Sequence, residues 1–227
     1  MSDYQINNPA TGELEATYPT ATEQDIQQVI EQADNAYQDW RQVSLSERSA
    51  LLHKIADSYL ERQDELARIV AGEMGKPVAQ AKGEIGLVAE IYRYYADNAE
   101  QLLAPNTIDV DSGSASVEKR PVGVLLGIMP WNYPHYQVAR FVAPNFMAGN
   151  TIILKHAPQC PNTAEVIVDI FKDAGVPEGV YNNIFATNEQ SATIINDTRV
   201  QGVSLTGSER AGQAVAKEAG GALKKVV

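Results

Sequence analysis

The sequence feature that most constrains the fold is a continuous apolar run that begins at Val122 and stops at Pro130. An apolar run bounded by glycine and proline is typical of a strand that is buried on both faces. Two similar runs follow, Thr151–Lys155 and Gly202–Thr206, and helix-like sequence lies between the three. Strands that alternate with helices predict a parallel sheet covered by helices. We therefore expect an α/β, Rossmann-like fold with helices on both faces of the sheet.

Capping and turn signals predict the remaining elements. The Asn8–Glu13 turn cluster predicts a small N-terminal hairpin, and Ser44 with Glu47 forms a capping box for a long helix. After the strand that ends at Lys155, we expect a helix at about 163–174, a short strand at 183–185, a helix at 192–196 and a last helix after Gly207. The chain is expected to comprise an N-terminal hairpin and helices (1–105), a polar, poorly buried hairpin (106–120) and a Rossmann-like core (121–227). The exposed hairpin must be capped or paired, because its edges are templates for association.

Composition narrows the class of partner. The formal net charge of −11 argues against a nucleic-acid partner, because phosphate backbones are bound by clustered lysine and arginine. Apolar runs stay well short of the ~20 residues of a membrane helix, and the first residues do not resemble a secretory signal. The three histidines show no metal-ligand spacing, and the single cysteine excludes an internal disulfide. We expect a cytoplasmic protein without a metal, membrane or nucleic-acid partner.

Asn132 lies between Pro130 and Pro134, just after the first buried strand. In open α/β sheets, ligands bind beyond the carboxyl ends of the strands. An asparagine there can direct its side-chain NH2 group at a developing negative charge, as in an oxyanion hole. It can equally be a turn residue that bonds to its own backbone. The residues alone leave both interpretations open.

Two further segments could bind a nucleotide. Lys155 ends an apolar strand, where it could contact ribose hydroxyls or a phosphate, or simply extend into solvent. Gly207 and Ser208 follow a predicted strand and begin a helix, and Gly212 lies in its first turns. Helix N-termini attract phosphate, but an ordinary strand-to-helix turn with a serine cap explains the same pattern.

Arg140 and Cys160 are the other residues with chemical potential. The helix expected from Pro134 presents Tyr136, Gln137 and Arg140 on one face, where the guanidinium could bind a carboxylate or remain an exposed helix residue. Cys160 is flanked by prolines and has no nearby base in the sequence to activate it. We expect Cys160 to be a loop residue and not a nucleophile.

Taken together, three segments resemble the aldehyde dehydrogenase superfamily: Pro130-Trp131-Asn132-Tyr133-Pro134, the strand that ends at Lys155, and Thr206-Gly207-Ser208. The Lys-His-Ala-Pro loop at 155–158 is similar to that of bacterial succinate-semialdehyde dehydrogenases. The resemblance covers the whole chain and corresponds to the N-terminal portion of a family member. It implies NAD(P)-dependent oxidation of an aldehyde, here succinate semialdehyde, to the acid. In the family a thiolate attacks the aldehyde, a hydride passes to the nicotinamide, and water releases the product.

The resemblance also implies roles for individual residues. Asn132 would bind the oxyanion, and Arg140, with Tyr133 and Gln137, would bind the substrate and its distal carboxylate. Cofactor binding would fall to Pro130, Trp131, Lys155, His156, Ala157, Pro158, Gly207, Ser208 and Gly212. Pro158 stands where the family often has a glutamate, whose charge would repel a 2′-phosphate. Both NAD and NADP are therefore expected cofactors.

The resemblance further predicts what this polypeptide does not contain. In the family the nucleophilic cysteine and the general-base glutamate lie downstream, so we expect the C-terminal catalytic domain to be absent and the isolated chain to be inactive. The hairpin at 106–120 would form a subunit interface in a homo-oligomer, a dimer or tetramer. The alternative interpretation is an inert dinucleotide-binding or dimerisation fragment, which could also pair with a full-length relative.

Overall fold

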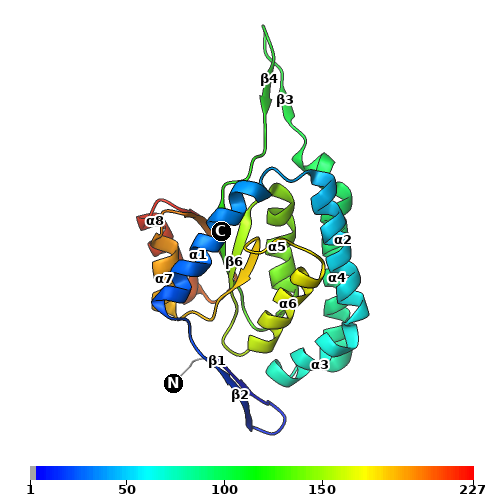
Figure 1. Cartoon of the computed structure of the whole chain (residues 1–227), viewed down its shortest axis with the longest axis vertical. Helices are drawn as coiled ribbons and strands as arrows, with labels where there is room; N and C mark the ends of the chain where they lie inside the picture. Colours follow the sequence, from blue (N-terminus) through cyan, green and yellow to red (C-terminus); the bar gives the residue numbers. More distant parts are fainter. Residues whose placement is uncertain (1–3) are drawn as a thin grey trace.

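A five-stranded parallel sheet forms the centre of the computed structural model, which describes residues 4–227 (Figure 1). The strands are β5 (Val124–Ile128), β6 (Thr151–Lys155), β7 (Tyr181–Asn183), β8 (Val200–Leu205) and β9 (Lys225–Val226). Their order is β7-β6-β5-β8-β9, so the chain builds outward from β5 in one direction and then returns to add β8 on the other side. The strand order therefore reverses between β5 and β8, which is the position where open α/β sheets bind ligands.

Both faces of the sheet are covered, as predicted. Leu125 and Leu154 belong to a core shared with α5 (Tyr136–Ala148) and α6 (Pro161–Asp173). Val124 and Ile153 alternate with them and belong to a second core, shared with α1 (Glu23–Trp40), α7 (Asn188–Asn196) and α8 (Glu209–Gly221). Because successive strand residues point to opposite faces, this alternation buries the strands completely.

Three further helices form an outer layer beyond α5. They are α2 (Leu45–Glu61), α3 (Gln63–Met74) and α4 (Val78–Leu103). The predicted capping box begins α2, since Ser44 accepts from the Glu47 amide and the Glu47 carboxylate accepts from the Ser44 amide. The long helix expected after this capping box is α2, and α3 follows it as a separate helix because the chain departs from helical geometry at Arg62. Among residues 4–227, no helix has the length and apolar character needed to cross a membrane.

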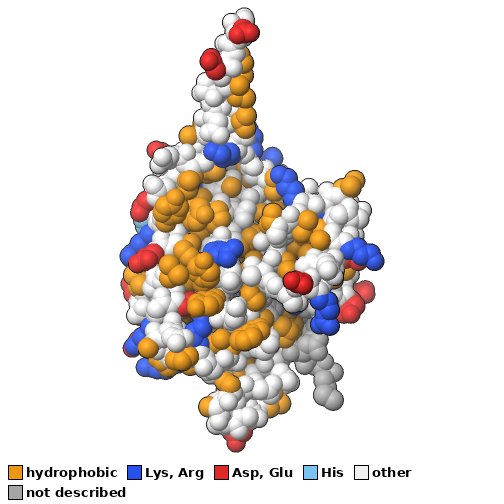
Figure 2. Space-filling model, turned by 180° about the vertical axis from the view of Figure 1, so that it is seen from behind, with side chains coloured by type: hydrophobic (Ala, Val, Ile, Leu, Met, Phe, Trp, Pro, Cys, Tyr) orange, Lys and Arg blue, Asp and Glu red, His pale blue; other side chains and the backbone are white. Residues whose placement is uncertain are grey.

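Two hairpins extend from the body of the protein (Figure 1). The predicted N-terminal hairpin is formed by β1 (Tyr4–Asn7) and β2 (Leu14–Tyr18). The second consists of β3 (Asn106–Ile108) and β4 (Ala115–Val117), and every β3 side chain is exposed. Ile108, Val110 and Val117 place a stripe of hydrophobic side chains along it (Figure 2). The hairpin at 106–120 is confirmed; its interface role and the division into three domains stay predictions.

The structure corrects two predicted boundaries. The strand expected at 183–185 lies two residues earlier, because the Tyr181 ring stacks on Phe171 at 4.3 Å and the side-chain NH2 group of Asn182 donates to the Ile152 carbonyl. The helix expected at 192–196 begins at Asn188, because Thr187 forms a capping box with Gln190 that the sequence analysis overlooked.

Candidate active site

The carboxyl ends of β6, β5 and β8 meet at one edge of the sheet. Ile128 is in register with Lys155 on one side and with Leu205 on the other. The Met129 amide donates to the Lys155 carbonyl at 3.1 Å, and the Thr206 amide donates to the Ile128 carbonyl at 3.0 Å. The three segments singled out from the sequence therefore leave the sheet side by side, at the point where the strand order reverses.

A pocket of about 720 Å³ opens at this edge, between α7 and α8. Its lining includes Ile128, Lys155, Ser191, Leu205, Ser208 and Ala211. Three cationic side chains (Lys155, Arg210 and Lys217) and two carboxylates (Glu189 and Glu218) also belong to the lining. An apolar floor with a few polar groups and a cationic excess suits a ligand that combines a flat ring with phosphates.

A second pocket, of about 850 Å³, lies between α1 and α6 beside the edge strand β7. Four carboxylates line it, from Asp25, Glu165, Asp169 and Glu178, against the one ammonium group of Lys172. This larger pocket would repel phosphates, and it lies away from the edge where β5 and β8 end. The smaller pocket is therefore the better candidate for a nucleotide site.

Lys155 and Ser208 are the two predicted cofactor residues that reach the pocket between α7 and α8. Lys155 is 7% exposed, so it is not the solvated strand-end residue of the alternative interpretation. Ser208 is the N-cap of α8, and its Oγ accepts from the Ala211 amide at 3.3 Å. A hydroxyl that accepts this bond still has its own hydrogen to donate. Gly207 precedes the cap and Gly212 lies in the first turns of α8; neither belongs to the pocket lining.

Asn132 lies in the exposed loop that follows β5. Trp131 and Tyr133, its neighbours, are 47% and 48% exposed. Within residues 4–227 the Asn132 side chain makes no hydrogen bond, so the structure gives no support to a turn residue that bonds to its own backbone. Its amide group is available to a ligand at this edge.

His156 is fully buried, and both of its ring nitrogens have partners within the chain. Its Nε2 lies 2.9 Å from the Pro134 carbonyl, and its Nδ1 accepts from the Ala157 amide at 2.8 Å. Burial lowers the pKa of His156 to about 4, so at neutral pH the ring is uncharged and Nε2 carries the hydrogen that Pro134 accepts. Both ring nitrogens are thus used within the chain. The side chain supports the Asn132 loop and has no polar atom left for a cofactor.

The three predicted substrate residues lie along the start of α5. The exposed Arg140 guanidinium lies 5.7 Å from the centre of the Tyr136 ring, and the Tyr133 and Tyr136 rings meet edge to face at 5.9 Å. Gln137 lies between Tyr136 and Arg140 in sequence, and its Oε1 is buried without a partner among residues 4–227. A planar guanidinium at an exposed position near Asn132 in sequence is suited to a carboxylate. None of the three belongs to the lining of either pocket.

Cys160 is fully buried at the N-cap position of α6. Burial raises the pKa of its thiol far above the ordinary value, and the nearby carboxylates of Glu73 and Glu84 act in the same direction. Because the thiolate is the reactive form, burial and a raised pKa both work against this thiol acting as a nucleophile at neutral pH. Among residues 4–227, no group of three or more histidine, cysteine or acidic side chains could hold a metal ion.

Sequence reasoning did not find Lys76 and Glu84, a buried ion pair beneath the Asn132 loop. Glu84 accepts a hydrogen bond from the amide of His135, which lies 51 positions further along the chain. Neither Lys76 nor Glu84 belongs to a recognisable motif. A lysine just before a proline and a glutamate within a helix look like ordinary surface residues in the sequence. Only the packing of α4 against α5 identifies them.

Comparison with known proteins gives a consistent result. The family model described as "Aldehyde dehydrogenase family" matches residues 1–227. A succinate-semialdehyde dehydrogenase of Deinococcus radiodurans, named as NADP(+)-dependent, is 50% identical over 97% of this chain and 46% of its own length. An Escherichia coli K12 succinate semialdehyde dehydrogenase, named for NAD(P)+, is 40% identical over 97% of this chain and 48% of its own.

Solved structures agree with the sequence relatives. The succinic semialdehyde dehydrogenase of Streptococcus pyogenes, crystallised with NADP+, superposes with a TM-score of 0.96 at 42% identity. The match covers 98% of this chain and 49% of that one. The chain thus spans about half the length of the relatives it matches.

Proposed function

The chain belongs to the aldehyde dehydrogenase family, and from this premise we propose that it binds NADP or NAD where β5, β6 and β8 end together. The proposed reaction of the whole protein is the oxidation of succinate semialdehyde to succinate. The single observation that carries the proposal is the pocket between α7 and α8, which opens at the reversal of strand order and is lined by Lys155 and Ser208.

The residues at this edge fit a dinucleotide. The apolar side chains of Ile128, Ile195 and Leu205 suit the faces of a flat base, and Lys155 is a donor and a cation beside them. Ser208 caps the N-terminus of the 13-residue helix α8, where free amides and the helix dipole favour phosphate. We assign cofactor contacts to Pro130, Trp131, Lys155, Ala157, Pro158, Gly207, Ser208 and Gly212, and a supporting role to His156. The bound dinucleotide would supply the hydride acceptor.

We propose that NADP is accepted as well as NAD. Pro158 follows Lys155 by three residues and carries no charge that would repel a 2′-phosphate. The pocket lining also has one more cation than it has carboxylates. The relatives from D. radiodurans and E. coli are named for NADP(+) and NAD(P)+, respectively, which supports the same choice.

Asn132 is the proposed oxyanion donor, and Arg140 is proposed to bind the distal carboxylate of the substrate. The support for Asn132 is its exposed amide in the loop after β5. One such donor typically contributes about 3–4 kcal/mol to lowering the barrier. Arg140 lies eight residues further on with Tyr133 and Gln137 before it, so that a short dicarboxylic semialdehyde could be held at both ends.

The chain by itself is proposed to bind the cofactor without catalysing the reaction. Its one cysteine is buried and inert, so no thiolate is available to attack an aldehyde. The exposed apolar stripe of Ile108, Val110 and Val117 supports the second proposal that the 106–120 hairpin pairs with another copy of the chain.

The test is a calorimetric titration of the 227-residue chain with NADP+. We expect saturable binding, and we expect Lys155→Met to weaken it about tenfold or more, since a charged hydrogen bond contributes about 1.5–3 kcal/mol. Lys172→Met, in the other pocket, is the matched control and should leave the affinity unchanged. A folded chain that binds no NADP+, or two variants with equal affinity, would contradict the assignment.

A further inference from the structure

The Asn132 loop lies next to a buried ion pair that the proposed reaction does not use. Lys76 immediately precedes the Pro77 N-cap of α4, and Glu84 lies two turns into that helix. Their side chains are 7% and 1% exposed, and the Lys76 ammonium contacts the Glu84 carboxylate. Burying two charges is costly, and a pair of apolar residues of the same size is often at least as stabilising. The pair therefore calls for an explanation other than stability alone.

Glu84 makes its remaining hydrogen bonds to the start of α5. Its Oε1 accepts from the amides of His135 and Tyr136, at 2.9 and 3.0 Å, while its other oxygen faces Lys76. The first amides of a helix have no acceptor within the helix, and the N-terminus attracts negative charge. The carboxylate thus fixes where α5 begins, with the N-cap His135 three residues after Asn132.

Lys76 also contacts the Asn132 loop, through the ring of Tyr133. Its Nζ lies 3.7 Å from the centre of the Tyr133 ring, within the range of a cation–π interaction. His156 adds a hydrogen bond to the Pro134 carbonyl. Four consecutive residues, from Tyr133 to Tyr136, are therefore each bound to a buried group outside the loop, and Asn132 immediately precedes them.

We propose that Lys76 and Glu84 are positioning residues that fix the direction in which Asn132 leaves β5. This inference rests on the proposed function of Asn132. An oxyanion donor works only within hydrogen-bond distance of the developing charge, and a displacement of about 1 Å can cost a large part of the rate. The acceptor oxygen of Glu84 carries the effect, and Lys76 balances its charge and orients Tyr133.

The test compares two double variants by amide hydrogen exchange on the full chain. Lys76→Met with Glu84→Gln removes both charges and keeps an acceptor oxygen, whereas Lys76→Met with Glu84→Leu removes the acceptor as well. The reporters are the amides of Met129 and Gln137, which donate to the carbonyls of Lys155 and Tyr133 and not to Glu84. The Ile152 amide, bonded to the Val180 carbonyl within the sheet, reports global unfolding.

We expect the Leu-containing variant to exchange both reporters about tenfold faster than the Gln-containing variant, because two hydrogen bonds are lost. Ile152 should exchange equally in the two. The proposal would be overturned if the two double variants exchanged the reporter amides at equal rates. It would also be overturned if the exchange of Ile152 rose as much as that of the reporters, because the pair would then stabilise the whole fold and not the loop. Should the Leu-containing variant not fold, Glu84→Asp, which keeps the charge but withdraws the oxygens, must accelerate the reporters or the proposal fails.

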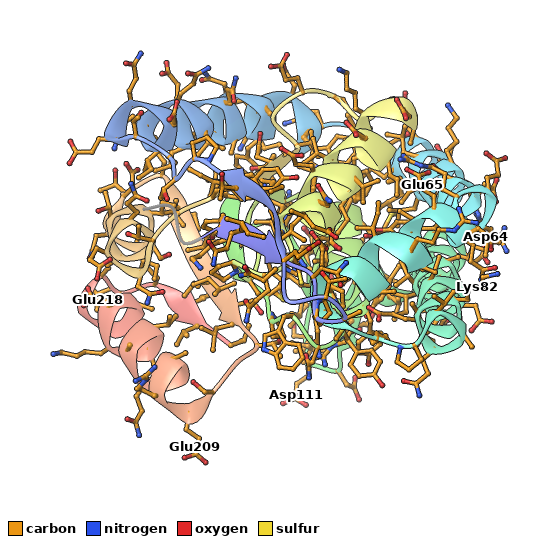
Figure 3. All side chains as sticks on the ribbon, turned by 90° about the horizontal axis from the view of Figure 1, so that it is seen from below. Asp64, Glu65, Lys82, Asp111, Glu209 and Glu218 are labelled. Carbon is orange, nitrogen blue, oxygen red and sulfur yellow. The ribbon has the colours of Figure 1, made fainter. Side chains whose placement is uncertain are left out.

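The matched control is the exposed ion pair between Lys82 of α4 and Asp64 of α3 (Figure 3). Asp64→Asn should leave the exchange of Met129 and Gln137 at the wild-type rate. The NADP+ titration is a separate readout. If the wild-type chain bound no NADP+ while the two double variants still differed in exchange, the proposed function would fail and the loop-positioning contacts would stand.

Discussion

The free energy of unfolding is expected to fall as the pH is lowered from 6.5 to 5, and two buried histidines are the cause. Burial lowers the pKa of His135 to about 3 and that of His156 to about 4, whereas both titrate near 6.5 in an unfolded chain. Between these values the unfolded state binds more protons than the folded state, so acid favours unfolding. Each histidine contributes about 1.4 kcal/mol per pH unit in this window.

Glu73 opposes the histidines over part of the same range. Burial raises the pKa of its carboxyl group to about 7, although hydrogen bonds from Thr163 and from the Asn162 amide favour the charged form. Because the pKa of this carboxyl group is raised, the folded state holds its proton between pH 4.5 and 7 whereas the unfolded state loses it. Glu73 therefore lowers the free energy of unfolding as the pH rises through this range. Two histidines against one carboxyl leave a net slope of about 1.4 kcal/mol per pH unit between 5 and 6.5.

Urea denaturation at several pH values between 5 and 6.5 measures this slope. His156→Gln keeps a donor for the Pro134 carbonyl and removes one titration, so the slope should become nearly flat, whereas Glu73→Gln should about double it. A wild-type stability that rises on acidification over this range would contradict the assignment of neutral, buried histidines.

Gly179→Ala is expected to lower the free energy of unfolding by about 2–5 kcal/mol. Gly179 has a φ of +84°, and a Cβ at this position would lie 2.6 Å from the Gln32 backbone oxygen and 2.8 Å from the Ala36 Cβ, both on α1. An L-residue in left-handed geometry costs about 1–2 kcal/mol, and overpacking against a backbone that cannot shift adds about 1–3. The substitution would displace α1 from the edge of the sheet.

Gly175→Ala separates the two contributions. Gly175 has nearly the same φ, +88°, but a Cβ there would meet nothing within 4 Å. Its alanine variant should therefore lose only the conformational part, about 1–2 kcal/mol. Chemical denaturation of the two variants side by side gives the difference directly. Equal losses would mean that contact with α1 does not constrain the 175–180 loop.

Much of the fold could be predicted because its strands are continuous apolar runs. The apolar run that begins at Val122 and the run Thr151–Lys155 form adjacent parallel strands. Alternate residues of each strand pack against helices on opposite faces of the sheet, as expected. The family assignment from three short segments is confirmed as well. The edge strand β7 was displaced in the prediction because its position is set by contacts of Tyr181 and Asn182 with distant residues, and local sequence does not record such contacts.

The candidate site was predictable where chemistry follows strand ends and not where it depends on packing. Lys155 and Ser208 reach one pocket because parallel strands end at the same edge. His156 looked equally suitable in sequence, but burial commits its ring to Pro134 and Ala157. The Lys76–Glu84 pair could not be predicted, because its role depends on the hydrogen bonds of Glu84 to the start of α5, which is distant in sequence. Glu209 of α8, unlike the buried Glu84, has the exposed side chain that its sequence suggests (Figure 3).

The central claim is that the three strand ends form one nucleotide site, and photolabelling with an azidoadenine analogue of NADP+ tests it most directly. We predict adducts within α7 and α8, between residues 188 and 218, that disappear when unmodified NADP+ competes. Adducts in the acidic pocket between α1 and α6, or labelling that NADP+ does not prevent, would contradict the claim.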